Sequence, residues 1–75
     1  MTHTATAKQN LDDARLIRLR EVMAKTGLSR SYVYALAQKG QFPQPVKLTE
    51  RSSAWVQAEV QEWIDSRIQA RGEVA

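Results

Sequence analysis

LREVMAKTGLSRSYVYALAQKG, residues 19–40, decides the fold, because its apolar spacing predicts two short helices joined by a tight turn. Gly27 follows the first helical pattern and can take the positive φ that ends a helix. Ser29 is placed to cap the second helix, and Leu28 is placed to pack on Val33 as a hydrophobic staple. The apolar face of the first helix consists of residues at helical spacing: Leu19, Val22, Met23 and Thr26.

The second helix is expected from Arg30 to Lys39, with Gly40 as the residue that ends it. Pro43 and Pro45 prevent its continuation, since proline has no amide N–H to donate. Two short helices around a tight turn are typical of a helix-turn-helix. Three apolar residues form the inward face of the second helix: Val33, Leu36 and Ala37.

Two short β-rich segments, residues 46–48 and 54–56, follow the prolines and predict a hairpin. The connection between them contains neither Gly nor Asn, which favours a longer, mobile loop over a two-residue primed turn. Such a hairpin beside the second helix would act as a wing, with Lys47 at its edge and Arg51 at its tip against the DNA backbone.

A third helix is expected over about residues 57–71. We expect Trp63 to anchor it against the helix-turn-helix, with Trp55 as its neighbour, and we assign both indoles to the core rather than to base stacking. The apolar face of the third helix is predicted to consist of Val60, Trp63, Ile64, Arg67 and Ile68. The core that covers the motif is predicted to include Trp55, Val56, Trp63 and Ile64.

The predicted architecture is mainly α with a small β-hairpin: a winged helix-turn-helix of three helices and a two-stranded wing. At 75 residues the chain is long enough for one domain, which we place at residues 15–71. Residues 1–14 are expected to form a flexible tail, in which His3 has no assigned role, and residues 72–75 a frayed end.

Composition argues against several classes of protein. There is no cysteine, and one histidine with scattered carboxylates offers no convergent catalytic or metal-binding set, so we expect neither an enzyme nor a cofactor, metal or small-molecule substrate. The longest apolar run is too short to span a bilayer, and the first ten residues lack the apolar core of a signal peptide. We therefore expect a cytoplasmic protein with no membrane partner.

Basic charge is concentrated on the segment that contains the motif. Residues 15–51 carry eight basic and two acidic side chains, whereas both flanking segments are net acidic. This distribution indicates a phosphate-binding face, although the total net charge is only +3.

The chain resembles the AlpA-like phage and prophage regulators, within the wider group of MerR-like and excisionase-like winged helix-turn-helix proteins. The resemblance covers residues 18–67. It is carried by LREV at 19–22, TGLSRS at 26–31, Tyr34, GQFP at 40–43, PVKL at 45–48, Trp55 and EVQEWI at 59–64. This resemblance implies a transcriptional regulator of prophage genes, which in some members acts on an integrase or excision gene.

The mechanism we expect is insertion of the second helix into the major groove of double-stranded DNA. Arg30 is the leading candidate to read a base, and a phosphate contact is its alternative. Tyr32 lies between the inward and outward faces, and we expect it at the edge of the core. The predicted DNA-binding residues are Arg30, Ser31, Tyr34, Gln38, Lys25, Lys39, Lys47 and Arg51.

Two other functions fit the same sequence. An excisionase-like architectural protein would use this fold to bend recombination-site DNA. An antitoxin or other protein-interaction module would use the third helix as a partner surface. A domain of this size buries little DNA surface, so a homodimer or a cooperative assembly on DNA is also expected.

Overall fold

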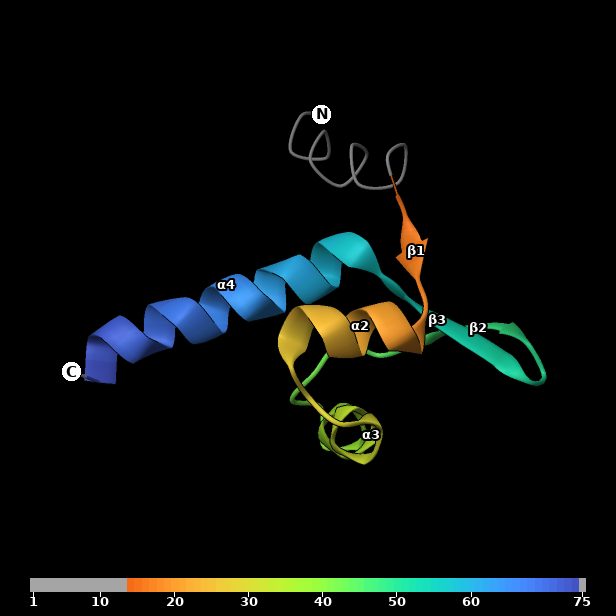
Figure 1. Cartoon of the computed structure of the whole chain (residues 1–75), viewed down its shortest axis with the longest axis horizontal. Helices are drawn as coiled ribbons and strands as arrows, with labels where there is room; N and C mark the ends of the chain where they lie inside the picture. Colours follow the sequence, from red (N-terminus) through yellow and green to blue (C-terminus); the bar gives the residue numbers. More distant parts are fainter. Residues whose placement is uncertain (1–13, 75) are drawn as a thin grey trace.

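The structure, a computed structural model, describes residues 14–74, and the side chains of residues 14–72. It contains three helices and a small antiparallel sheet, which confirms the winged helix-turn-helix architecture (Figure 1). The predicted tail, residues 1–14, lies outside the described residues except for Ala14. In chain order the elements are β1 (Leu16–Ile17), α2 (Leu19–Thr26), α3 (Arg30–Gln38), β2 (Val46–Thr49), β3 (Ser52–Val56) and α4 (Gln57–Val74).

The turn between α2 and α3 forms as the sequence predicts. Gly27 has φ 78° and donates its amide to the Met23 carbonyl at 2.8 Å. Ser29 accepts a hydrogen bond from the Tyr32 amide at 3.2 Å, so it caps α3. The Thr26 hydroxyl adds two bonds, donating to a carbonyl one turn earlier and accepting from the amide two residues later. The turn is therefore held by local bonds at both of its ends.

The strand β1 is an element that the sequence pattern does not predict. It lies at one edge of a three-stranded sheet of order β1-β3-β2, and Ile17 is paired with Trp55. Two residues are too few to show an alternating pattern, and their partner strand lies far along the chain. β1 ties the start of the domain to the strand that carries the central tryptophan.

The hairpin forms as predicted, but its connection is shorter than expected. Thr49 is paired with Ser52, which leaves only Glu50 and Arg51 in the turn, so the prediction of a longer loop is wrong. The turn is not of the primed type, since only glycines have positive φ among the described residues. Instead, a bulge at Leu48 shifts the register, and the Thr49 hydroxyl accepts the Arg51 amide at 3.2 Å.

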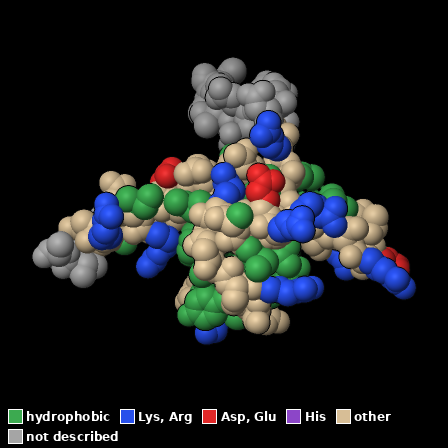
Figure 2. Space-filling model, in the orientation of Figure 1, with side chains coloured by type: hydrophobic (Ala, Val, Ile, Leu, Met, Phe, Trp, Pro, Cys, Tyr) green, Lys and Arg blue, Asp and Glu red, His purple; other side chains and the backbone are tan. Residues whose placement is uncertain are grey.

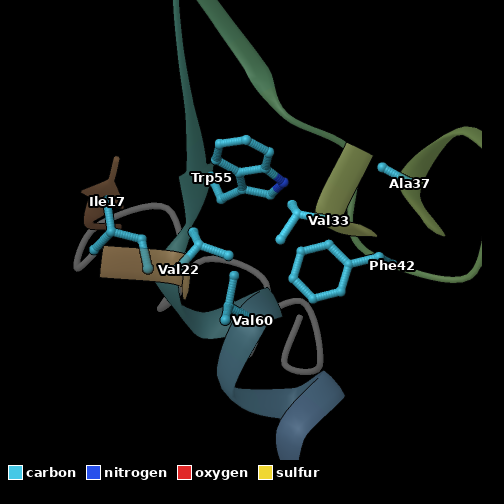
Figure 3. Packing of buried hydrophobic residues seen from close by; sticks show 7 residues of the cluster. All are labelled: Ile17, Val22, Val33, Ala37, Phe42, Trp55 and Val60. Atoms are coloured by element: carbon cyan, nitrogen blue, oxygen red, sulfur yellow. The ribbon is translucent and has the colours of Figure 1, made fainter. Parts of the chain in front are cut away.

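The core lies where the three helices meet the sheet, and every element except β2 contributes to it. Trp55 is completely buried, and its indole N–H donates to the Pro43 carbonyl at 3.1 Å. Figure 3 shows Val33 of α3 pointing toward Trp55 and Phe42. The buried cluster consists of Ile17, Val22, Val33, Ala37, Phe42, Trp55 and Val60.

Helix α4 covers this core with its first half and extends past it with its second half (Figure 1). Val60 is buried, and Trp63 and Ile64 pack against the cluster, but Arg67 is exposed and Ile68 is 52% exposed. The predicted apolar face is therefore correct only for its first part, because the core ends before the helix does. The helix continues to Val74, beyond the predicted end at residue 71.

The ranking of the two tryptophans is the reverse of the prediction. Trp55, expected as the neighbour, is the fully buried side chain, whereas Trp63 is only half-buried. The Trp63 indole N–H donates to the Gln41 carbonyl at 2.8 Å, and its ring meets Phe42 edge-on at 4.9 Å. Both indoles thus hold the segment that joins α3 to β2.

Within residues 14–74, none of the helices combines the length and the apolar content that a membrane crossing requires.

Candidate nucleic-acid interface

One face of α3 is free of the core and forms the centre of the candidate site. Val33 and Ala37 are buried, so the opposite face of the helix points outward. Ser31 and Gln38 on that face are exposed, and Ala35 between them is half-buried. In Figure 1 the helix is seen nearly end-on below α2, at the surface of the molecule. The predicted division of this helix into an inward and an outward face is therefore confirmed.

The N-terminal end of α3 is electropositive. Arg30 is its first residue and is exposed, and the first turn contains no acidic side chain. A cation at the positive end of a helix dipole is unfavourable by a few tenths of a kcal/mol. The arrangement therefore does not stabilise the helix by itself, whereas an anion placed there would interact with both the guanidinium and the dipole.

The hairpin of β2 and β3 projects beside α3 (Figure 1). Lys47 lies in β2, opposite Ser53, and Arg51 lies in the two-residue turn at the tip. Both basic side chains are exposed. In Figure 2, Lys and Arg side chains lie over the hairpin and over the outer half of α4, on the two sides of α3.

Tyr34 connects α3 to the hairpin. Its side chain is 41% exposed, and its ring lies 5.7 Å from the Trp55 ring at an interplanar angle of 59°. Trp55 belongs to β3, which continues directly into the tip of the hairpin. An aromatic contact therefore joins α3 to the strand that carries the hairpin.

The other two predicted lysines lie at the ends of helices. Lys39 caps the C-terminal end of α3 and is exposed, so it lies at the border of the outward face. Lys25 is in the last turn of α2 and is half-buried. The structure thus brings Arg30, Ser31, Tyr34 and Gln38 together on one helix, with Lys47 and Arg51 on the adjoining hairpin and Lys25 on a separate helix.

The prediction for Tyr32 is wrong. The helical pattern places it at the edge of the core, but its side chain is 55% exposed. The prediction rests on its place between the inward and outward faces, yet only Leu36, one turn further along, packs against the core. Its exposure depends on how far α4 reaches over this flank of α3, which local periodicity does not report.

Comparison with known proteins finds a matching family and similar proteins. The family model described as "Prophage CP4-57 regulatory protein (AlpA)" matches residues 15–68, which run from β1 into the outer half of α4. A protein of Enterobacteria phage P4, "Uncharacterized protein ORF88", is 42% identical over 62 residues, covering 83% of this chain and 70% of that protein. The "DNA-binding transcriptional activator AlpA" of Escherichia coli strain K12 is 31% identical over 64 residues, covering 77% of this chain and 91% of that protein.

Proposed function

The chain belongs to the AlpA family of prophage regulatory proteins, and from this premise we propose that it is a sequence-specific, double-stranded-DNA-binding transcriptional regulator of prophage or mobile-element genes. The observation that carries the proposal is the outward face of α3, which is free of the core, begins with Arg30 and has a basic hairpin fixed beside it. An exposed helix of this size fits the major groove of B-DNA. The protein would act in the cytoplasm, where a prophage genome is transcribed.

We assign different roles to the residues of the outward face and to the basic residues around it. Arg30 reads a guanine, because its planar guanidinium matches the two acceptors of that base in the major groove. Ser31 and Gln38 contact base edges or the backbone next to it, and the Tyr34 hydroxyl donates to a phosphate. The remaining contacts are electrostatic and independent of sequence: Lys25, Lys39, Lys47 and Arg51.

The small size of the interface favours more than one copy on the DNA. Single DNA-binding modules bury roughly 600 to 1,000 Å² of protein surface, which is at the low end for specific recognition. We therefore propose that the chain binds repeated sites, either as a homodimer or cooperatively.

The test begins with recovery of the DNA that is crosslinked to the tagged full chain in its host. A promoter fragment is the expected product, whereas an attachment-site fragment would assign the chain to an architectural role. The recovered fragment is then titrated with the variant Arg30→Ala/Gln38→Ala. We expect a loss of at least about tenfold in affinity, since each good base contact contributes about 1 to 3 kcal/mol.

The matched control is Gln69→Ala/Arg71→Ala, which removes the same two kinds of side chain from exposed positions of α4. Its affinity should stay within about twofold of that of the unmodified chain. An equal loss in both double variants, or the absence of any enriched DNA, would overturn the proposal.

A further inference from the structure

Helix α3 has a second flank, opposite to the one that faces the hairpin. Because α-helical residues are about 100° apart, Tyr32 and Tyr34 leave α3 on nearly opposite sides. Tyr34 faces the hairpin strand through Trp55. Tyr32 faces a groove of about 580 Å³ between α3 and α4. The groove is lined by Leu28, Tyr32, Leu36, Gln41, Trp63 and Arg67.

The Trp63 ring forms the floor of this groove, and a basic side chain lies over it. The Trp63 ring is held by its hydrogen bond to the Gln41 carbonyl and by its edge contact with Phe42. The guanidinium carbon of Arg67 lies 5.9 Å from the centre of that ring. A cation–π contact at this distance attracts the guanidinium to the ring face and leaves its N–H donors free.

The charge of Arg67 is also not neutralised along its own helix. The positions three and four residues away on either side are Trp63, Ile64, Ala70 and Arg71, none of which is acidic. Tyr32 adds a phenolic hydroxyl on a side chain that is 55% exposed. The groove thus has one cation near the Trp63 ring and one exposed hydroxyl at its rim. Phosphate oxygens accept hydrogen bonds from donors of these two kinds.

We propose that Tyr32 and Arg67 form a second phosphate-binding site. This site binds the DNA strand that borders the major groove on the side opposite the hairpin. Figure 1 shows α3 end-on between the hairpin and the outer half of α4, and Figure 2 shows basic side chains on both of these sides. A helix of about 10 to 12 Å diameter fills a groove about 12 Å wide, so residues on its two flanks meet the two bordering backbones. This inference rests on the proposed function and extends it from one strand to both.

The first arm of the test uses Arg67→Gln on the recovered DNA fragment, titrated at several salt concentrations. We expect the slope of log affinity against log salt to decrease by about one contact, with the same loss on unrelated DNA. Arg67→Lys retains the charge and should retain the slope. The control is Arg71→Gln, the same change one turn further along α4 at a residue outside the groove lining, and its slope should not change.

The second arm uses Tyr32→Phe, which keeps the ring and removes only the hydroxyl. We expect affinity to fall about two- to fivefold on all DNA with an unchanged salt slope, because a neutral donor releases no counterion. Phosphate ethylation interference then locates the phosphates that each side chain binds. Some phosphates interfere with binding of the unmodified chain when they are ethylated, but not with binding of Arg67→Gln, and these should lie on one strand. The phosphates identified in the same way with Arg51→Ala should lie on the other strand.

Each other outcome is decisive. Unchanged binding by Arg67→Gln and Tyr32→Phe, with reduced slopes for the hairpin variants, would overturn the second phosphate site and leave the proposed function intact. An equal decrease in slope for Arg71→Gln would show that any positive charge on α4 has this effect. That outcome would also overturn the second phosphate site. If Arg67→Gln unfolds in a melting experiment, the affinity and the ethylation pattern of Tyr32→Phe decide the question. Unchanged binding in every variant, Arg30→Ala included, would instead contradict the proposed function.

Discussion

The ring of Tyr34 in the middle of α3 lies 5.7 Å from the ring of Trp55 in β3, so the outward helix and the hairpin meet through two aromatic side chains. Trp55 cannot move independently, because it is fully buried and its indole N–H is bonded to the Pro43 carbonyl. The contact joins the outward helix to the strand that carries the hairpin. We therefore expect Tyr34 to position the hairpin as well as to donate to a phosphate.

Substitutions of Tyr34 should separate these two roles. Tyr34→Phe removes the hydroxyl and keeps the ring, so we expect a two- to fivefold loss of affinity. Tyr34→Ala also removes the ring contact and should cost about tenfold or more, since aromatic pairs contribute about 0.5 to 1.5 kcal/mol beyond their buried area. Titration of both variants gives the comparison, and equal losses would show that the ring contact does not position the hairpin.

The same contact predicts coupling between Tyr34 and the tip of the hairpin. If Tyr34→Ala releases the hairpin, Arg51 contributes less to DNA affinity, so Arg51→Ala should cause a smaller further loss. The double variant should therefore lose less affinity than the sum of the two single losses. Strict additivity in this cycle would mean that the two residues act independently.

The hairpin itself should contribute binding without specificity. We expect Lys47→Ala and Arg51→Ala each to lower the salt slope by about one, with equal losses on specific and unrelated DNA. Glu50→Gln, which removes a negative charge from the same turn, should act in the opposite direction and strengthen binding slightly. Titrations at several salt concentrations measure all three, and unchanged slopes for both basic residues would place the hairpin away from DNA.

The unequal burial of the two tryptophans predicts unequal stability effects. Trp55→Ala should cost about 3 to 5 kcal/mol, comparable with the whole stability of a small domain, and should leave the chain largely unfolded. Trp63→Ala should cost less, roughly 2 kcal/mol, because Trp63 is only half-buried. Urea unfolding followed by circular dichroism gives both values. A larger loss for Trp63 would restore the role that the sequence pattern assigns to it.

The features that the sequence predicts correctly have local determinants. The turn between α2 and α3 depends on Gly27 with its positive φ and on the Ser29 cap, and both act within a few residues of their own position. The inward face of α3 follows from spacing alone. The candidate residues on its outward face can therefore be named from the sequence.

The features that the sequence does not predict have long-range determinants. β1 exists because Ile17 is paired with Trp55, a partner that no local pattern indicates. The short hairpin turn depends on a bulge at Leu48, which has no simple sequence signature. The helical pattern assigns Arg67 to an apolar face as if α4 were covered along its full length, whereas the core ends near Ile64.

The turn between the helices gives a prediction with an internal control. Gly27→Ala should destabilise the domain by about 1 to 2 kcal/mol through backbone strain alone, since φ is 78° and no atom lies within 4 Å of the added Cβ. Gly72→Ala, in α4, also meets no atom but needs no positive φ, so it should be neutral or stabilise by up to about 1 kcal/mol. Thermal unfolding should show a lowered Tm for Gly27→Ala and an unchanged or raised Tm for Gly72→Ala. A Gly27→Ala variant as stable as the parent would contradict the turn geometry.

The remaining prediction concerns Arg30, which stands in the first turn of α3 after the Ser29 cap, where a helix-turn-helix presents side chains to base edges. If Arg30 reads a guanine, Arg30→Ala should cost about 1 to 3 kcal/mol on the recovered site and much less on unrelated DNA. Competition with single-base variants of the site should then show that discrimination is lost at one base pair.

A different pattern of loss would reassign this side chain. An equal loss on every sequence would make Arg30 a phosphate contact and would move base reading to Ser31, Tyr34 or Gln38, which share the outward face. Arg30→Lys sharpens the distinction, because lysine keeps the charge but lacks the planar fork that matches two acceptors. It should preserve the binding to unrelated DNA while weakening the binding to the specific site. If neither variant changes binding to any DNA, then α3 does not enter the groove, because an exposed cation at its leading end would otherwise meet either a base or a phosphate.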